Sequence, residues 1–364
     1  MSTARTLMVM AGGTGGHIYP GLAAAAALRK HGWNVVWLGT RNGMEARLVP
    51  EHGYPMAWLS LGGVRGNGVL RKLLLPATLL VAFVQALRAL RRHRPDVVLG
   101  MGGYPSFPGG MMSVLLGKPL VIHEQNSVGG LANRVLACVA DRVLTGFPDV
   151  FNSARDKPLP CSKVATTWVG NPVRASIAAL PAPQPRSAPR LCLLVVGGSL
   201  GAAALNDVVP RALALIPEAE RPAVIHQSGT RHADSLRANY AAAGVAAEVR
   251  DYIADMAEVY AWCDFAITRA GALTIAELAA AGVPAVLVPY PHAVDDHQTR
   301  NAQFLSAAGA ALLLPQTELT PDRLATVLRS LNREKLLAMA QHARAQARPD
   351  ASEEVARICM ELAQ

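Results

Sequence analysis

Two stretches decide the fold: LMVMAGGTGGH at residues 7–17 and LCLLVVGGSLGA at residues 191–202. Each begins with an apolar run of strand length and passes through a glycine-rich turn into an alanine-rich segment that predicts a helix, the first over about residues 19–30. A strand, a glycine loop and a helix in this order are typical of the first turn of a doubly wound α/β domain. Because the pattern occurs twice, the sequence predicts two such domains.

Shorter apolar runs follow each glycine loop and alternate with segments of helical pattern. This alternation predicts parallel sheets that are covered by helices. The predicted strands are residues 7–10, 35–38, 97–99, 120–123 and 142–145 in the first half, and 191–196, 224–227, 265–268 and 285–288 in the second. The proline-rich stretch at 180–190 cannot continue a helix, so we interpret it as an exposed connector near the domain boundary.

The length and the charge limit the classes of function. The chain has 364 residues, and 35 Lys and Arg against 26 Asp and Glu give it a formal charge of +9. That length exceeds what one hydrophobic core usually organises, which also favours two domains. The positive charge favours an anionic partner, such as a phosphate ester, a nucleic acid or an acidic membrane surface, and does not choose among them.

The cysteines and the apolar runs bear on the compartment. Five cysteines are scattered without a CxxC pair, so we expect neither a zinc site nor a disulfide framework, and a reducing cytoplasm fits best. The polar first residues run directly into a strand, which argues against a signal peptide. The longest apolar stretch, residues 73–84, is shorter than the roughly 20 residues that cross a bilayer, so no transmembrane helix is expected.

A glycine loop before a helix is a place where a phosphate can approach backbone N–H groups, because glycine has no obstructing Cβ. A dinucleotide fold would add an acid after the second strand, but Gly39-Thr40-Arg41 follows residue 38. Neither loop carries the GKS or GKT of an ATP-binding P-loop. NAD and ATP are therefore disfavoured. Each loop taken alone also fits a tight turn that merely joins a strand to a helix.

Polar residues at strand ends are candidates for chemistry. His17 directly follows the first loop, and imidazole transfers protons near neutral pH, although a lone histidine is more often structural. The segments at 100–105 (GMGGYP) and 123–126 (HEQN) each follow a strand, so both are expected at the carboxyl edge where ligands bind. We do not expect four consecutive polar residues in the core. The alternative is a hydrogen-bonded loop.

The segment at 268–277 leads from a strand through small residues into a helix. Glu277 lies three residues after Thr274, a spacing that matches a capping box and needs no ligand. A carboxylate early in such a helix can instead accept hydrogen bonds from a ribose diol, and the spacing does not separate the two interpretations. Further along, Asp295, Asp296 and His297 precede Gln298, but no other ligand spacing supports a metal site.

Six motifs in order carry a family resemblance. They are GGTGGH at 12–17, GMGGY at 100–104, HEQN at 123–126, VGNPVR at 169–174, GGSLGA at 197–202 and the GALT segment ending at Glu277. Together with DDHQ at 295–298, they resemble the MurG family, bacterial transferases that add N-acetylglucosamine to the lipid-linked muramyl-pentapeptide of peptidoglycan synthesis. The resemblance spans nearly the whole chain. One departure is Leu200, where the family usually has Gln.

The resemblance implies an α/β fold of the GT-B class, two Rossmann-like doubly wound parallel-sheet domains facing across a cleft. The first domain is expected at 1–172 and the second at 173–344. The last helix, about 345–364 with Ser352 as its predicted N-cap, is expected to return to the first domain. The implied reaction inverts the anomeric centre, with UDP as the leaving group, and needs neither a cofactor nor an obligatory metal.

The resemblance also implies roles for individual residues. His17 is the expected general base, with Glu124 behind it. The residues expected to bind UDP-N-acetylglucosamine are Thr14, Gly15, Gly16 and Asn126 from the first domain, Arg174 at the hinge, and Ser199, Ile253, Ala272, Leu273, Thr274, Glu277 and Gln298 from the second. The acceptor diphosphate is expected near the first glycine loop.

A lipid-linked acceptor requires contact with a bilayer, and residues 69–94 have suitable properties. Apolar residues there are flanked by Arg65, Arg71 and Lys72 on one side and by Arg88, Arg91, Arg92 and Arg94 on the other. Such a segment can lie on an anionic membrane surface, or it can be an ordinary amphipathic helix packed on the sheet. The expected location is the cytoplasmic face of the inner membrane, as a peripheral protein.

Two other functions remain open at this stage. One is a UDP-N-acetylglucosamine 2-epimerase, which has the same fold and donor and needs no lipid acceptor. The other is a non-catalytic protein that binds a nucleotide sugar or serves as a membrane scaffold. Nucleic acid is not an expected partner, and the resemblance leaves open partners among other cell-wall enzymes.

Overall fold

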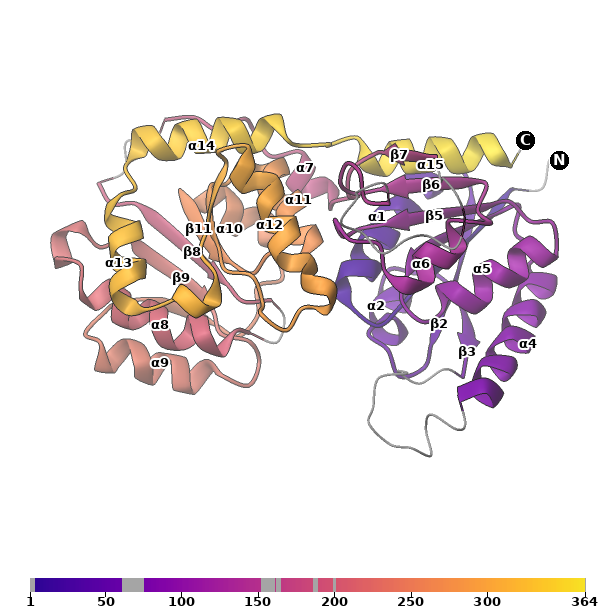
Figure 1. Ribbon diagram of the computed structural model, residues 1–364, viewed down its shortest axis with the longest axis horizontal. Helices are drawn as coiled ribbons and strands as arrows, with labels where there is room; N and C mark the ends of the chain where they lie inside the picture. The colour runs from indigo at the N-terminus through magenta and orange to yellow at the C-terminus, as the bar shows by residue number, and fades with distance from the viewer. Residues whose placement is uncertain are drawn as a thin grey trace. The chain divides into compact units, whose positions relative to one another are not determined.

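The computed structural model describes residues 4–60, 75–151, 161, 165–185, 189–198 and 201–363. Two compact units divide the chain: Met1–Arg174 with Arg348–Gln364, and Ala175–Ala347. These divisions lie beside the expected boundaries at 172 and 344. Each unit contains one parallel sheet with helices packed against it (Figure 1). The predicted doubly wound α/β class is therefore confirmed for both units.

The first unit is built on a seven-stranded sheet in the order β3-β2-β1-β4-β5-β6-β7, and all its pairs are parallel. Its strands are β1 (Thr6–Ala11), β2 (Asn34–Thr40), β3 (Met56–Leu59), β4 (Val97–Gly102), β5 (Leu120–Glu124), β6 (Arg142–Thr145) and β7 (Thr166–Trp168). Its helices are α1 (Gly15–Lys30), α2 (Glu45–Glu51), α4 (Leu75–His93), α5 (Ser106–Leu115), α6 (Leu131–Leu136) and α15 (Ala351–Leu362).

The second unit is built on a six-stranded parallel sheet in the order β10-β9-β8-β11-β12-β13. Its strands are β8 (Cys192–Val196), β9 (Ala223–Gln227), β10 (Glu248–Arg250), β11 (Phe265–Thr268), β12 (Ala285–Leu287) and β13 (Ala311–Leu313). Its helices are α7 (Ala175–Ala178), α8 (Ala203–Ala214), α9 (Ala233–Ala242), α10 (Met256–Trp262), α11 (Ala272–Ala281), α12 (His297–Ala307), α13 (Pro321–Arg329) and α14 (Arg333–Ala345). Three 3₁₀ turns complete it, at Glu218–Glu220, Val294–Asp296 and Gln316–Glu318.

Aspartates fix the amino ends of several strands. Asp96, just before β4, accepts a hydrogen bond from the backbone N–H of Thr6 in β1 at 2.7 Å. Asp264, just before β11, does the same for Cys192 at the start of β8 at 2.8 Å. Each carboxylate satisfies an N–H that the parallel ladder leaves unpaired at its first residue. Both units therefore begin their central strand pairs in the same way.

Small residues let α1 lie close to the first sheet. A Cβ on Gly21 would be 2.7 Å from the ring of Trp37 in β2, a distance no side chain tolerates. Trp37 is fully buried, and its indole N–H donates to the carbonyl oxygen of Ala11 at 2.9 Å. A buried indole needs such a partner. The close packing of α1 on β1 and β2 fixes the direction in which the glycine loop between β1 and α1 must turn.

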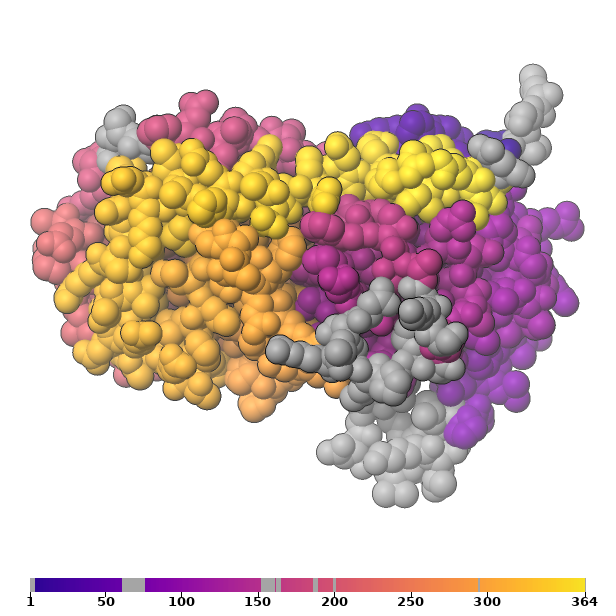
Figure 2. Space-filling view, turned by 45° about the horizontal axis from the view of Figure 1, so that its top comes forward, coloured from indigo at the N-terminus to yellow at the C-terminus, as the bar shows by residue number. Residues whose placement is uncertain are grey.

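The C-terminal helix α15 belongs to the first unit. Its buried residues Val355, Ile358 and Cys359 join the core formed by α1 and the first sheet. Figure 2 shows this helix in yellow on the surface of that unit. The helix begins at Ala351 after Asp350, so the predicted N-cap at Ser352 is wrong and Ser352 lies in the first turn. The N-cap position, Asp350, lies two residues before the predicted one.

The structure corrects two further expectations. Helix α1 begins at Gly15 and not near Tyr19. Glycine is a poor helix former, so a glycine-rich sequence does not indicate a helix even where the backbone is helical. Cys138 and Cys161 form a disulfide, contrary to the expectation of none. These two cysteines are 23 residues apart in sequence. The return of the chain after α6 brings them together, which their spacing does not reveal.

Candidate functional site

The first glycine loop joins β1 to α1 and holds His17 at the first turn of the helix. Thr14 is the N-cap, and its side chain makes no capping hydrogen bond. The N–H groups of Gly15 and Gly16 therefore face outward at the positive end of the helix dipole. His17 Nδ1 lies 3.3 Å from the carbonyl oxygen of Gly12. Its ring packs on Gly102 at the end of β4, where an added Cβ would lie 2.9 Å from Cδ2.

A buried acid that the sequence analysis missed braces this loop. Glu45, the first residue of α2, is 0% exposed. One carboxylate oxygen accepts from the N–H of Gly13 at 3.0 Å, and the other accepts from Thr40 N at 2.9 Å and Thr40 Oγ1 at 2.7 Å. The acid sought after the second strand therefore exists, five residues beyond Thr40, and folds back under the loop. The only local signal for it is an acid five residues after the end of the strand, beyond the position at which a dinucleotide fold carries its acid.

Three residues of the HEQN segment are buried, so the expectation that these residues lie outside the core is wrong. His123, Glu124 and Gln125 are at most 3% exposed. Glu124 Oε1 accepts from Asn126 N at 3.0 Å and from Asn126 Nδ2 at 3.4 Å. Its Oε2 accepts from Gly130 N at 3.0 Å and from Asn133 Nδ2 at 2.9 Å. These hydrogen bonds satisfy the Glu124 carboxylate, which is how it can be buried.

His123 is held in one protonation state. Its Nε2 lies 2.9 Å from the carbonyl oxygen of Gly170, and its Nδ1 lies 3.1 Å from the amide nitrogen of Gln125. A carbonyl only accepts and an amide nitrogen only donates, so Nε2 carries the hydrogen and Nδ1 carries the lone pair. Burial lowers the pKa of His123 to about 4, and the hydrogen bond with Gly170 opposes this only partly. His123 is therefore a neutral, buried residue with a structural role.

The second glycine loop, between β8 and α8, is braced by a neutral side chain. Gln227 at the end of β9 donates from Nε2 to the carbonyl oxygen of Gly198 at 2.9 Å and accepts at Oε1 from Ile253 N at 2.9 Å. Gly201 has a positive φ of 77°, and a Cβ there would lie 1.9 Å from the carbonyl oxygen of Ser228. Only glycine fits that position. Ser199, predicted to contact the diphosphate, and Leu200 lie outside the described residues.

Helix α11 presents backbone donors at its start. Its N-cap is Gly271, which has no side chain to satisfy the first N–H groups, so those of Ala272, Leu273 and Thr274 face the carboxyl edge of the sheet. The capping-box interpretation of Thr274 is therefore wrong, because Thr274 is already inside the helix. Glu277 is 5% exposed, and its Oε2 accepts from the hydroxyl of Tyr260 at 3.3 Å.

Gln298 and Ile253 lie at the same edge. The Oε1 of Gln298 accepts from Ala270 N at 3.2 Å and from Tyr290 N at 2.9 Å, so the side chain is fixed beside the start of α11. Ile253 is 3% exposed. Beside them, Arg269 donates to Gln316 Oε1 at 2.6 Å, and burial lowers the pKa of its guanidinium.

Each sheet thus gathers its own set of predicted residues at its carboxyl edge. In the first unit these are Thr14, Gly15, Gly16 and His17 at α1 and Glu124 and Asn126 after β5. In the second unit they are Ile253, Ala272, Leu273, Thr274, Glu277 and Gln298. Arg174, the last residue of the first unit, places its guanidinium carbon 5.6 Å from the ring centroid of Tyr19 in α1. In both units the residues are those that can bind anions and hydroxyl groups.

Comparison with known proteins identifies the family. The N-terminal domain model of glycosyltransferase family 28 matches residues 7–145, and its C-terminal domain model matches residues 192–355. The chain belongs to glycosyltransferase family 28. Two curated relatives carry the name UDP-N-acetylglucosamine–N-acetylmuramyl-(pentapeptide) pyrophosphoryl-undecaprenol N-acetylglucosamine transferase. The one from Thiobacillus denitrificans is 66% identical over 361 residues, 99% of this chain and 98% of the relative, and the one from Dechloromonas aromatica is 60% identical over 99% of both chains.

A solved structure agrees with this family 28 assignment. The crystal structure of Acinetobacter baumannii MurG is 40% identical in sequence and superposes with a TM-score of 0.81. The match covers 98% of this chain and 99% of that one. The MurG resemblance carried by the six motifs and the predicted GT-B fold class are both confirmed. As a family 28 member, the chain is a glycosyltransferase.

Helix α4 of this family 28 chain has an exposed stripe that is apolar at one end and basic at the other. Leu80, Val81 and Val84 are 64%, 47% and 38% exposed. Arg88, Arg91 and Arg92 continue the same stripe at helical spacing and are exposed. The opposite face, with Ala82, Ala86 and Leu90, is buried. Arg65, Arg71 and Lys72, and residues 69–74 in general, lie outside the described residues.

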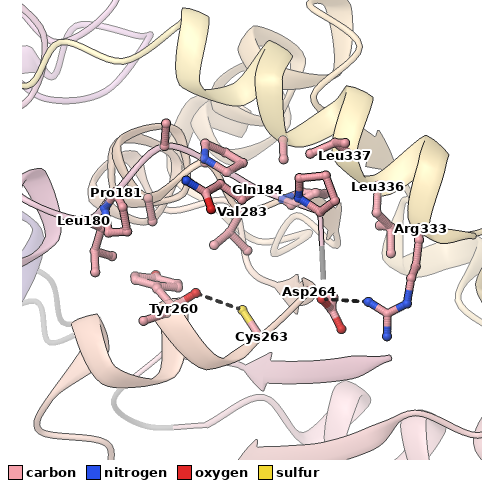
Figure 3. Close-up of a pocket in the computed structure, with 18 of the residues that line it drawn as sticks. Leu180, Pro181, Gln184, Tyr260, Cys263, Asp264, Val283, Arg333, Leu336 and Leu337 are labelled. Atoms are coloured by element: carbon pink, nitrogen blue, oxygen red, sulfur yellow. Dashed lines mark hydrogen bonds and ion pairs between the residues drawn. The ribbon is translucent and has the colours of Figure 1, made fainter. Parts of the chain in front are cut away.

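A cavity of about 610 Å³ lies in the second unit (Figure 3), and the predicted site residues are not among those that line it. It opens at the amino edge of the sheet, where Arg333 faces Asp264 at 3.5 Å. Tyr260 lines it and also donates to Glu277.

Within the described part of the chain, no helix is both long and apolar enough to cross a membrane, and no cluster of three or more His, Cys, Asp or Glu side chains is arranged to hold a metal ion.

Proposed function

We propose that this chain transfers N-acetylglucosamine from UDP-N-acetylglucosamine to an undecaprenyl-diphospho-N-acetylmuramoyl-pentapeptide, with release of UDP, in peptidoglycan synthesis. The observation that carries the proposal is the 66% identity, over nearly the full length of both chains, to a relative named for that reaction. The site supports it, because each sheet edge combines a glycine loop with a helix start whose side chains leave backbone donors available to phosphate.

The donor is assigned to the second unit. The start of α11 offers the N–H groups of Ala272, Leu273 and Thr274 to the diphosphate, and the uncapped Gly271 favours such a ligand. Glu277 lies within the same helix, and its buried carboxylate, which accepts from Tyr260 at Oε2, is an acceptor-only group of the kind that binds a ribose diol. Ile253 and Gln298 border this position and would contact the uracil and the sugar.

The reaction is an inverting displacement. The hydroxyl oxygen of the acceptor sugar attacks C1 of N-acetylglucosamine, the bond between C1 and the β-phosphate oxygen breaks, and UDP leaves with its electron pair. The proton of the attacking hydroxyl passes to Nε2 of His17. Nδ1 lies 3.3 Å from the Gly12 carbonyl oxygen and 3.5 Å from Thr14 Oγ1. The nearer contact supports this role, because a carbonyl only accepts and so favours a hydrogen on Nδ1 and a lone pair on Nε2, while the hydroxyl can accept from the same N–H.

Glu124 is assigned a supporting role in place of a reserve base. Its carboxylate accepts four hydrogen bonds, two from Asn126, one from Gly130 and one from Asn133 in α6. Asn126 is half-buried and follows Glu124 directly, so the acid sets the direction of the Asn126 amide. Together with Thr14, Gly15 and Gly16, that amide would contact the sugar. Arg174, held over Tyr19, would contact the nucleotide.

Membrane contact is assigned to α4. Its apolar end can enter the acyl boundary while the arginines at its other end meet anionic headgroups. The proposed location is therefore peripheral, at the cytoplasmic face of the inner membrane. Replacing Arg88, Arg91 and Arg92 by Ser should weaken binding to vesicles of phosphatidylglycerol. Replacing the exposed Arg5, Arg47 and Arg142 of the same unit is the charge-matched control. Equal binding by both triple variants would remove α4 from the proposal.

A UDP-release assay with purified lipid acceptor tests the function itself. We expect release with UDP-N-acetylglucosamine, and much slower release with UDP-glucose or UDP-N-acetylgalactosamine. Epimerisation of the donor without acceptor would support the epimerase alternative. Donor binding without UDP release in the presence of acceptor would support a non-catalytic protein. Either result would overturn the proposal.

A further inference from the structure

The peptide group between Gly12 and Gly13 is held at both ends. Its N–H belongs to Gly13 and donates to Glu45 Oε2 at 3.0 Å. Its carbonyl belongs to Gly12 and lies 3.3 Å from His17 Nδ1. A carboxylate, one peptide group and an imidazole therefore form a single chain of hydrogen bonds. Such chains polarise each of their members, because each bond strengthens the next.

The surroundings prevent this peptide group from turning. A Cβ on Gly103 would lie 2.2 Å from the Gly12 carbonyl oxygen, so the backbone of residue 103 stands directly against it. A Cβ on Gly12 would lie 2.5 Å from Glu45 Oε1. The carboxylate is equally fixed, because Thr40 donates to it from both its N–H and its hydroxyl. All three partners of Glu45 donate, which suits a side chain that only accepts.

We propose that Glu45 is a positioning residue for catalysis: through the Gly12–Gly13 peptide group, it holds His17 with the hydrogen on Nδ1 and the lone pair on Nε2. The inference rests on the proposed role of His17 as the base. It also gives a role to a fully buried acid whose hydrogen bonds run to Gly13 and Thr40. An imidazole in the opposite tautomer would present Nε2–H to the acceptor hydroxyl and could not accept its proton.

Glu45→Gln tests this link with little change of shape. The one oxygen of the new amide can accept from Gly13 or from Thr40 but not from both, and the negative charge is lost. We expect kcat to fall about 10-fold with the KM for the donor unchanged, a loss in the range seen when an orienting partner of a histidine is removed. The matched control is Glu51→Gln, which removes an exposed acid from the same helix, and it should keep wild-type kcat.

A double-mutant cycle separates positioning from a general structural role. If Glu45 acts through His17, then adding Glu45→Gln to His17→Ala should change kcat by less than about twofold, because neighbouring residues that act as a unit are not additive. A further 10-fold loss in the His17→Ala background would overturn the proposal. So would a Glu45→Gln variant that keeps wild-type kcat.

The tautomer of His17 gives a readout that needs neither turnover nor the variant. Nitrogen-15 NMR of the wild-type ring at a pH where it is neutral should show Nδ1 protonated and Nε2 unprotonated, and Glu45→Gln should shift the population toward the other tautomer. A wild-type ring protonated on Nε2 would overturn the inference even if the variant does not fold. If instead the tautomer is as expected but His17→Ala keeps normal turnover, the proposed base is wrong and the link from Glu45 to His17 stands.

Discussion

The two glycine loops are built on the same strand, turn and helix, yet different groups stand behind them. Behind the first loop lies the carboxylate of Glu45, which takes up the N–H of Gly13. Behind the second lies the neutral amide of Gln227, which takes up the carbonyl of Gly198. The carboxylate of Glu45 thus uses one backbone N–H of the first loop, whereas the amide of Gln227 uses a carbonyl and no N–H of the second. The same motif is thus adapted to two different tasks.

This difference assigns the tasks. The second loop and the start of α11 retain their positive potential, which suits the diphosphate of UDP. In the first loop, the N–H of Gly13 donates to the internal acid Glu45, and the carbonyl of the same peptide group contacts His17. We infer that the second unit holds the donor and that the first loop serves the proton transfer. Variants of the first loop should therefore change mainly kcat, whereas variants of the donor site in the second unit should change mainly the KM for the donor.

The largest effect is expected for His17→Ala. Loss of a general base typically costs about 100-fold or more in kcat, while the KM for UDP-N-acetylglucosamine should stay near the wild-type value. Steady-state UDP release at saturating donor and acceptor measures both. His31→Ala, an exposed histidine at the far end of the same helix, is the control. Near-normal turnover of His17→Ala would remove it as the base.

The opposite pattern is expected for Glu277→Gln in the second unit. A buried carboxylate that accepts from a ribose diol contributes about 2 kcal/mol, so donor affinity should fall about 30-fold, with a much smaller change in kcat. Calorimetric titration with UDP gives the affinity directly. Glu258→Gln, an exposed acid on the neighbouring α10, should bind UDP as the wild type does. Equal affinities of the two variants would contradict the ribose assignment.

Acid should destabilise the first unit through His123. Its pKa is about 4 in the folded state and 6.5 in the unfolded state. Below pH 6.5 the unfolded chain therefore binds more protons than the folded one, and the free energy of unfolding decreases as the pH is lowered. The cost at pH 5 relative to pH 7 is about 2 kcal/mol. Urea unfolding measures it through tryptophan fluorescence, since all tryptophans except Trp262 lie in the first unit.

His123→Gln should lose this part of the pH dependence. The variant is expected to be less stable than the wild type at pH 7, but its stability should fall by about 2 kcal/mol less on going to pH 5. His52→Gln changes an exposed histidine of the same unit and should keep the wild-type pH dependence. An unchanged pH dependence in His123→Gln would show that another group controls acid unfolding.

The smallest effect is expected for Tyr260→Phe. It removes the hydroxyl that donates to Glu277 at 3.3 Å and leaves the carboxylate in place. One such hydrogen bond contributes about 1 kcal/mol, so the KM for the donor should rise about fivefold at constant kcat. Tyr240→Phe removes an equally buried hydroxyl of the same unit, which lies 2.9 Å from His226 Nδ1, and should leave the KM unchanged. A rise in both would indicate loosening of the whole unit.

Local patterns predicted most of the fold, because the strands and glycine turns depend on residues close in sequence. The strands β6 and β11 have the predicted bounds, and both glycine loops follow the predicted strands. The short edge strands β3, β7, β10 and β13 were missed, since runs of three or four residues carry little periodicity. The family was predicted from six motifs in order, which no single motif would have allowed.

The site was less predictable, because its hydrogen bonds join residues far apart in sequence. Glu45 meets Gly13, 32 residues earlier, and no local pattern indicates this. The burial of His123 depends on the carbonyl of Gly170, 47 residues later. Thr274 and Glu277 have the spacing of a capping box, but the N-cap of the helix is Gly271, three residues before Thr274. The roles of residues that depend on such long-range contacts can be inferred only from the three-dimensional structure.

The most direct test of the division between the loops is the response of backbone amides to UDP alone. In a TROSY spectrum of the full chain, UDP should shift the amides of Ala272, Leu273 and Thr274 and leave those of Gly13 and Gly15 in place. That result would assign the nucleotide to the second unit and leave the first loop for acceptor and proton. Shifts at Gly13 and Gly15 as large as those at the start of α11 would contradict the account.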